Sequence, residues 1–121
     1  MAICKTSPFA DAYFRFLRLS AAVAALPAFE ELDANHWSLL EAVALRWSTG
    51  TPMSVREAIH LVDLGSPATL HKRLQRLIKQ DLLSAQSHDG DRRTKYLAPS
   101  TKGLDYFHQM GKQLQYALNK A

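Results

Sequence analysis

The sequence predicts a mainly α-helical fold with one small β-hairpin, arranged as a helix-turn-helix followed directly by a wing. Three observations predict it. Helix signals lie on both sides of the turn at residues 65–67, and the helix after this turn is rich in Lys and Arg. Two short strand-like segments then flank an Asp-Gly turn at 89–90. The 121 residues have the length of one domain, so residues 1–121 are expected to form a single winged-helix domain.

Caps and prolines set the expected element boundaries. Pro27 ends the first helix, because a proline disfavours helical conformation in the residue before it. Asp33 is an N-cap, Ser54 and Glu57 match a capping box, and Pro67 stands at a first helical position. The predicted elements are helices over 11–26, 33–47, 54–62 and 66–80, strands over 82–87 and 95–98, and a last helix over 101–119.

Positive charge is concentrated in one third of the chain. Residues 1–65 carry five Lys and Arg against seven Asp and Glu, whereas residues 66–102 carry eight against three. Such a distribution is typical of a protein that meets a polyanion with one face. A solvated basic surface explains the charge equally well when the charge is taken alone.

The basic helix over about 66–80 has one apolar face, marked by Leu70, Leu74 and Leu77. At 100° per residue, most of its polar side chains point the other way. In the second helix of a helix-turn-helix, the first turns read bases in the major groove, and later cations meet phosphate. The candidate DNA-binding residues on this helix are Ser66, Ala68, Thr69, Lys72, Arg73 and Arg76, with Lys79 expected at phosphate.

The predicted wing, over about 84–98, carries cations that neither a turn nor a strand requires. Arg93 is expected to extend from the tip, where a narrow minor groove attracts guanidinium groups. Arg92 and Lys95 are further candidate DNA contacts. Asp91, two residues before Arg93, is expected to pair with an arginine and brace the wing.

The terminal helices, over about 9–26 and 101–119, each have two apolar stripes. A surface helix needs one stripe, so a second chain is expected to cover the other, although full burial within one chain is an alternative. The sequence therefore predicts a homodimer whose interface includes Phe14, Leu17, Phe107, Leu114 and Leu118.

The sequence resembles the MarR-type family of bacterial winged-helix repressors. The family's Asp-x-Arg-x-Lys wing signature matches residues 91–95, and its Thr-Glu-Lys-Gly-like helix start matches residues 100–103. The resemblance covers roughly residues 30–105. It implies DNA binding as a homodimer, with Arg93 in the minor groove and Asp91 bracing the wing.

Three features depart from the family pattern. Asp81 stands in place of a usual glycine, and Pro99 in place of an apolar residue. The chain also stops after one C-terminal helix, where family members usually continue. Because the family's terminal helices build the dimer and the ligand pocket beside it, the dimer geometry and a small-molecule effector both stay open.

Enzymatic chemistry has no support in the sequence. Five histidines are scattered without a second ligand at metal spacing, and the single cysteine, Cys4, lies far from them. No phosphate-binding glycine loop or nucleophile elbow is present. We therefore expect no catalytic residues, no metal and no cofactor.

The apolar stretch over 9–26 contains Asp11, Arg15 and Arg18, so it is not expected to span a membrane, and a cytoplasmic protein is expected. The expected function is sequence-specific binding of double-stranded DNA by a repressor-like transcription regulator. The alternative is a winged-helix protein–protein interaction module without DNA specificity. That alternative predicts apolar residues on the exposed helix face, where this chain has Lys72, Arg76 and Lys79.

Overall fold

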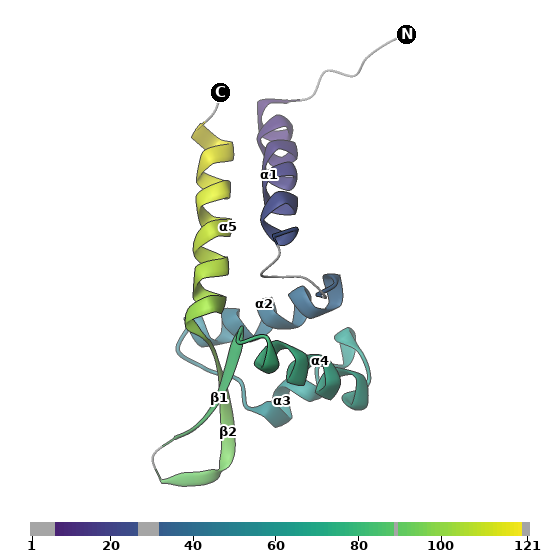
Figure 1. Ribbon diagram of the computed structural model, residues 1–121, viewed down its shortest axis with the longest axis vertical. Helices are drawn as coiled ribbons and strands as arrows, with labels where there is room; N and C mark the ends of the chain where they lie inside the picture. The colour runs from purple at the N-terminus through teal and green to yellow at the C-terminus, as the bar shows by residue number, and fades with distance from the viewer. Residues whose placement is uncertain (1–6, 27–31, 89, 120–121) are drawn as a thin grey trace. The chain divides into compact units, whose positions relative to one another are not determined.

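The computed structural model describes residues 7–26, 32–88 and 90–119, and within these it leaves the side chains of His88, Asp91 and Arg92 undescribed. The chain divides into two compact units, one of residues 1–30 with 105–121 and one of residues 31–104. The C-terminal helix α5 (Thr101–Asn119) starts in the second unit and continues in the first (Figure 1). We describe each unit by itself.

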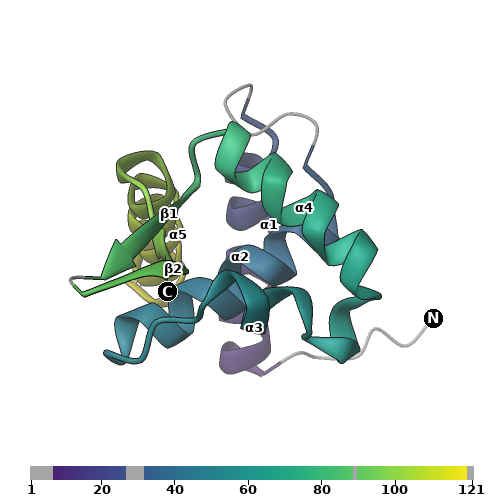
Figure 2. The ribbon, with the colours of Figure 1, turned by 90° about the horizontal axis from the view of Figure 1, so that it is seen from below.

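The unit of residues 31–104 contains the helix-turn-helix and the hairpin (Figure 2). Helix α2 (Ala34–Ser48) packs against α4 (Pro67–Lys79), and the short α3 (Val55–Ile59) packs against the same helix. A 3₁₀ turn, η2 (Val62–Leu64), lies between α3 and α4. Strands β1 (Leu83–His88) and β2 (Asp91–Pro99) then pair antiparallel. This order confirms the predicted mainly helical fold with one hairpin.

The core of this unit is built from leucines at helical and strand spacing. Each of the largest buried side chains is almost completely removed from solvent, which is the arrangement that apolar burial favours. They come from α2, from α4 and from the base of the hairpin: Leu39, Leu40, Val43, Leu70, Leu74, Leu77, Leu82, Leu83 and Leu97.

The base of the hairpin is fixed to the segment before α3. The backbone N–H of Leu97 donates to the carbonyl of Met53 at 2.8 Å, and Ser54 forms an isolated antiparallel bridge with Tyr96. The register runs from Leu83 opposite Pro99 to Ser87 opposite Lys95, and an irregularity follows before the turn. The hairpin is thus anchored at its base.

The unit of residues 1–30 and 105–121 pairs α1 (Pro8–Ala24) with the later part of α5, side by side in Figure 1. The Arg15 guanidinium donates to the carbonyl of Ala117 at 2.6 Å, which ties the two helices together. Val23 of α1 and Tyr106 and Ala117 of α5 are buried. None of the helices over the described residues is long and apolar enough to span a membrane.

Several predicted boundaries were wrong by a few residues. The first helix begins at Pro8, not Asp11, because the Ser7 hydroxyl accepts from the Ala10 N–H and caps it there; it ends at Ala24, not Leu26. The helix expected to reach Val62 ends at Ile59, where His60 closes it with its ring against the Arg56 carbonyl. Pro27, the expected stop of the first helix, lies outside the described residues.

The hairpin also differs from the prediction. Strand β1 begins at Leu83, one residue late, and β2 begins at Asp91, four residues before Lys95. Only Asp89 and Gly90 remain between the strands, and Gly90 has the positive φ of 88° that glycine adopts readily. The wing therefore has a longer second strand than the apolar pattern indicated.

Asp33 caps α2 as predicted, with its carboxylate accepting from the backbone N–H groups of Asn35 and His36. The His36 N–H is the largest cause of the lowered pKa of this carboxyl. Hydrogen bonds to the ionised form favour it, so the cap is charged at neutral pH.

A polar latch joins the end of α4 to the start of α5. Asp81 adopts a positive φ of 62°, which turns the chain out of α4, and its carbonyl accepts from the Ser100 hydroxyl. The Lys102 ammonium donates to the Gln80 carbonyl at 3.2 Å, and the Ser100 N–H donates to Leu82 at 3.1 Å. Gly103 is buried so close to Leu82 that a Cβ would overlap the Leu82 carbonyl oxygen.

Gly103→Ala is expected to lower the free energy of unfolding by about 1–3 kcal/mol, because the added methyl group has to displace backbone. Chemical denaturation monitored by circular dichroism measures this. His108→Ala, an exposed change on the same helix, should stay within about 0.5 kcal/mol of wild type. A Gly103→Ala protein as stable as wild type would show that the latch is not closely packed.

Candidate nucleic-acid interface

Arg46 holds the first helix of the helix-turn-helix in place. Its Nε donates to the Thr51 carbonyl at 2.9 Å, and its Nη2 lies 3.5 Å from Glu57 Oε2. Glu57 and Ser54 form the predicted capping box at the start of α3. The Ser54 N–H, with a smaller contribution from Arg46, lowers the pKa of the Glu57 carboxyl, so this corner carries an ion pair at neutral pH.

The turn before α4 is fixed by Arg73. One guanidinium nitrogen donates to the Leu64 carbonyl at 2.9 Å, nine residues back along the chain. Gly65, next in the turn, has a φ of 146°, and a Cβ there would lie 3.3 Å from Arg73 Nη1. The glycine thus admits both the backbone conformation and the close approach of the guanidinium group.

The start of α4 is capped without negative charge. Ser66 Oγ accepts from the Thr69 N–H at 3.3 Å and donates to Thr69 Oγ1 at 2.9 Å, while Pro67 occupies the first position. The first turn contains no acidic residue, unlike that of α3, where Glu57 caps the helix. The partial positive charge of this helix end therefore favours an external anion such as phosphate.

The outward face of α4 is mainly polar and carries four Lys and Arg residues. Leu70, Leu74 and Leu77 are buried, which sets the rotation of the helix about its axis. Of the other ten residues of α4, six are exposed and four are half-buried, and the last turns form a shallow open groove that Ile78 also lines. The exposed residues are Pro67, Ala68, His71, Lys72, Gln75 and Lys79, and the half-buried residues are Thr69, Arg73, Arg76 and Ile78.

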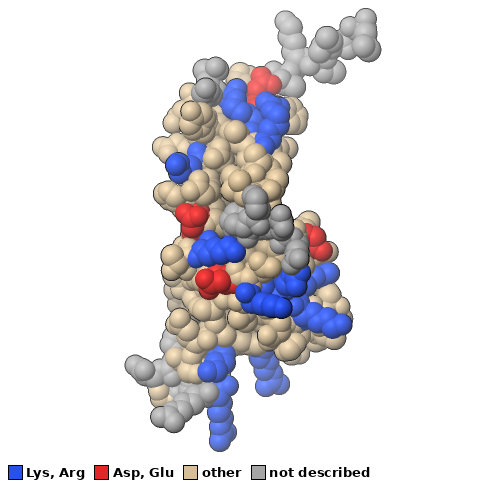
Figure 3. Space-filling model, viewed as in Figure 1, with Lys and Arg blue, Asp and Glu red and all other residues tan. Residues whose placement is uncertain are grey.

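Two wing cations are also exposed. Arg93 and Lys95 lie two residues apart on β2, and both side chains are exposed. Lys95 pairs with Ser87, the last regular pair before the turn. In the view of Figure 3, Lys and Arg side chains gather over the part of the unit that contains α4, and others project near the hairpin.

Some of the predicted interface residues are bound within the fold, and others point outward. The hydroxyls of Ser66 and Thr69 are used in the cap of α4, and Arg73 is bound to Leu64. Lys72 and Ala68 are fully on the outward face. The side chains of Asp91 and Arg92, predicted to brace the wing and to contact DNA, lie outside what the structure describes.

Sequence reasoning missed His71. It is exposed in the second turn of α4, 60° around the helix from Ala68, and so belongs to the outward face. The same helical spacing that selected Lys72 could have found it. Within the described part of the chain, no three His, Cys, Asp or Glu side chains are gathered so that they could hold a metal.

No protein-family model matches this chain, and no curated protein matches it either. Solved structures do. A transcriptional regulator of Thermotoga maritima aligns with a TM-score of 0.61 and 16% identity, over 90% of this chain and 68% of its own. Streptococcus pneumoniae FabT, solved in complex with DNA, aligns with a TM-score of 0.58 and 12% identity, over 91% and 73%.

Staphylococcus aureus MarR, solved with salicylate and kanamycin, aligns with a TM-score of 0.56 and 21% identity, over 89% of this chain and 67% of its own. At these identities the likeness establishes the fold. The chain therefore has the MarR-type winged-helix fold, and the resemblance carried by residues 91–95 and 100–103 is confirmed at that level.

Arg73→Met is expected to lower the free energy of unfolding by about 1–2 kcal/mol, because it leaves the Leu64 carbonyl without its charged donor. The Arg73 side chain is half-buried, so the loss should lie at the low end of the range for hydrogen bonds to charged groups. Lys72→Met, one residue away and exposed, should change it by less than about 0.5 kcal/mol. Denaturant titration of both variants measures the difference. Equal stabilities would mean that Arg73 does not fix the turn.

Proposed function

We propose that this chain is a transcription regulator that binds double-stranded DNA as a homodimer, with α4 in the major groove and the wing in the minor groove. The observation that carries the proposal is the outward face of α4, which is basic, free of acidic residues and set in the fold of solved regulators. One of those regulators, FabT, was solved with DNA.

The proposed roles along α4 follow from exposure. Lys72 reaches base edges from the second turn, and Ala68 offers a small apolar contact of the kind that a thymine methyl accepts. Arg76 and Lys79, in the last turns, meet phosphate. Ser66, Thr69 and Arg73 also act by holding the first turn of α4 in the orientation that base reading requires.

In the wing, Arg93 enters the minor groove and Lys95 meets the backbone beside it. Arg92 is a further contact, and Asp91 braces the tip by pairing with an arginine. These two roles rest on the family signature alone, because the side chains lie outside the described part. A repressor is the regulator type that the resemblance favours.

The homodimer is supported by the apolar faces that the first unit leaves open. The exposed fractions are 46% for Phe14 and 43% for Leu17 on α1, and 48% for Leu114 and 67% for Leu118 on α5, while Phe107 is half-buried. On the other stripe Tyr106 and Ala117 are buried, and Met110 and Gln113 are half-buried. Of the two stripes expected on α5, the one with the predicted interface residues is therefore available to a second copy.

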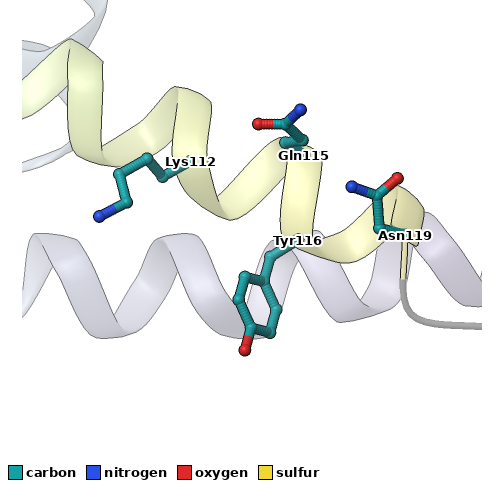
Figure 4. Close-up of a pocket in the computed structure, with 4 residues that line it drawn as sticks. All are labelled: Lys112, Gln115, Tyr116 and Asn119. Carbon is teal, nitrogen blue, oxygen red and sulfur yellow. The ribbon is translucent and has the colours of Figure 1, made fainter.

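A small-molecule effector stays a prediction. Staphylococcus aureus MarR was solved with salicylate and kanamycin. In this chain, a hollow of about 330 Å³ lies on α5 beside Lys112, Gln115, Tyr116 and Asn119, with Tyr116 pointing away from Gln115 and Asn119 (Figure 4). All four described lining residues belong to one helix, so they would hold a ligand from one side.

Protein docking through α4 is the second candidate, and exposure disfavours it. In the described part of residues 31–104, the large apolar side chains that are exposed are Leu45, Trp47, Val62 and Leu104, and none of these is on α4. A helix that docks on proteins normally presents apolar anchors at its centre. The exposed side chains of α4 instead include two lysines, one histidine and one amide, and its one unburied large apolar residue, Ile78, is half-buried.

Titration of fluorescent random-sequence duplex DNA at several salt concentrations tests the proposal. Wild type should bind with log Kd rising by several units per unit of log salt concentration, because phosphate contacts release counterions. Lys72→Ala and Arg93→Ala should each weaken binding, and Arg93→Ala should lower the slope by about one unit. Lys112→Ala, which removes an equal charge from the polar side of α5, serves as the control and should match wild type. Salt-independent binding, or none at micromolar protein, would contradict the proposal.

A further inference from the structure

The outward face of α4 has a centre and two flanks that differ in charge. The buried side chains of Leu70, Leu74 and Leu77 define the inner face, and the centre of the outward face lies opposite them. At about 100° per residue, Lys72 and Lys79 fall close to this centre. The side chains between the centre and the buried face form one flank on each side of the helix.

One flank carries permanent positive charge, and the other carries a single histidine. The charged flank consists of Thr69, Arg73 and Arg76, which are all half-buried. The second flank consists of His71, Gln75 and Ile78. His71 and Arg76 lie about 140° apart around the helix, so they point to opposite sides of the outward face. His71 is the only titratable side chain on its flank.

The imidazole of His71 has no partner over the residues that the structure describes. The side chain is exposed, and neither a hydrogen bond nor an ion pair joins it to another described residue. Two other histidines of the same unit are engaged. The His36 ring lies 3.0 Å from the Asp33 carboxylate, and the His60 ring lies 2.7 Å from the Arg56 carbonyl.

The charged and titratable groups that could face His71 lie on α4 itself and on the elements beside it. On α4 the nearest along the chain is Lys72. The others lie on α2, α3, η2 and β1: His36, Glu41, Arg46, Arg56, Glu57, His60, Asp63 and His88. Arg46 and Glu57 pair with each other at 3.5 Å, and the side chain of His88 lies outside the described part. The described groups leave the His71 imidazole available to an external acceptor.

We propose that His71 binds a DNA phosphate in its protonated form, so that its flank of α4 becomes positively charged only when the imidazole takes up a proton. A helix in the major groove directs its centre at base edges and its flanks at the phosphate backbones of the two strands. Arg76 supplies positive charge on one side at any pH, whereas a histidine changes its charge between pH 5 and 8. A phosphate beside the ring favours the charged form.

The inference rests on the proposed function and adds to it a proton-linked contact. If His71 gains a proton on binding, the complex holds more protons than its free components, so DNA affinity rises as the pH falls through the range in which histidine titrates. The same contact releases further counterions, so the salt dependence of binding is steeper at low pH. A neutral histidine that reads a base edge predicts neither change.

Titration of the full chain with fluorescent random-sequence duplex DNA at pH 5.5 and pH 8.0 measures the proton dependence. Wild type should bind about threefold to tenfold more tightly at pH 5.5, with a log–log salt slope steeper by about one unit for each protomer bound. His71→Gln should bind like wild type at pH 8.0 and lose most of the difference between the two pH values. His71→Lys, which is charged at both, should bind at pH 8.0 as tightly as wild type at pH 5.5.

His108→Gln is the matched control, because it removes an exposed histidine from α5, and it should keep the wild-type difference. Circular dichroism at both pH values checks that every variant is folded. If wild type binds with a salt-dependent Kd that is equal at the two pH values, or if His71→Gln keeps the full difference, the proton-linked contact is wrong and the proposed function stands. If wild type binds no DNA at either pH, the proposed function itself is wrong.

Discussion

The burial of three leucines on one face of α4 is the constraint on which the rest of the interface depends. Leu70, Leu74 and Leu77 are inaccessible to solvent, and any rotation of the helix would bring at least one of them into water at a cost of about 1.5–3 kcal/mol each. The helix therefore has one stable rotation about its own axis. Because this rotation is fixed, the side chains on the opposite face have to point outward: Lys72, Gln75 and Lys79. Packing, rather than any special property of the basic residues, decides which side chains can reach a partner.

Apolar packing sets the rotation of α4, and polar contacts set its position along its axis. At the N-terminal end, Arg73 binds the Leu64 carbonyl and the Ser66 hydroxyl caps the first turn. At the C-terminal end, the Lys102 ammonium meets the Gln80 carbonyl, where the partial negative charge of the helix end favours a cation. α4 is thereby held at both ends, while its exposed side chains Lys72, Gln75 and Lys79 make none of these contacts and remain available for binding.

The last two helices could be predicted closely from their own caps, and features that depend on contacts between distant residues could not. The helix over 101–119 has the expected bounds, and the helix after Pro67 ends within one residue of its expected end. The early start of β2 was missed because residues 91–94 have no apolar alternation, and of these four residues only Asp91 pairs with β1, opposite His88. Helical periodicity found two stripes on α5, but only packing against α1 shows which of them is buried.

The candidate interface was also predictable only where local sequence determines it. Periodicity selected Lys72, Arg76 and Lys79 correctly as outward or half-outward residues of α4. It placed Arg73 at the border of that face, but the hydrogen bond to Leu64 spans a turn whose geometry no periodic pattern specifies. Charge concentration found the surface, and three-dimensional contacts divided its residues into those that reach outward and those that hold the helix.

Selection of binding sites from a random duplex library tests the central claim most directly. A two-fold dimer that reads DNA with α4 should enrich a pseudo-palindrome whose half-sites lie about 10–10.5 base pairs apart, one helical turn from centre to centre. Lys72→Ala should relax the preferred base at one position in each half-site. Enrichment of a single unrepeated half-site, or no enrichment over input DNA, would contradict the account.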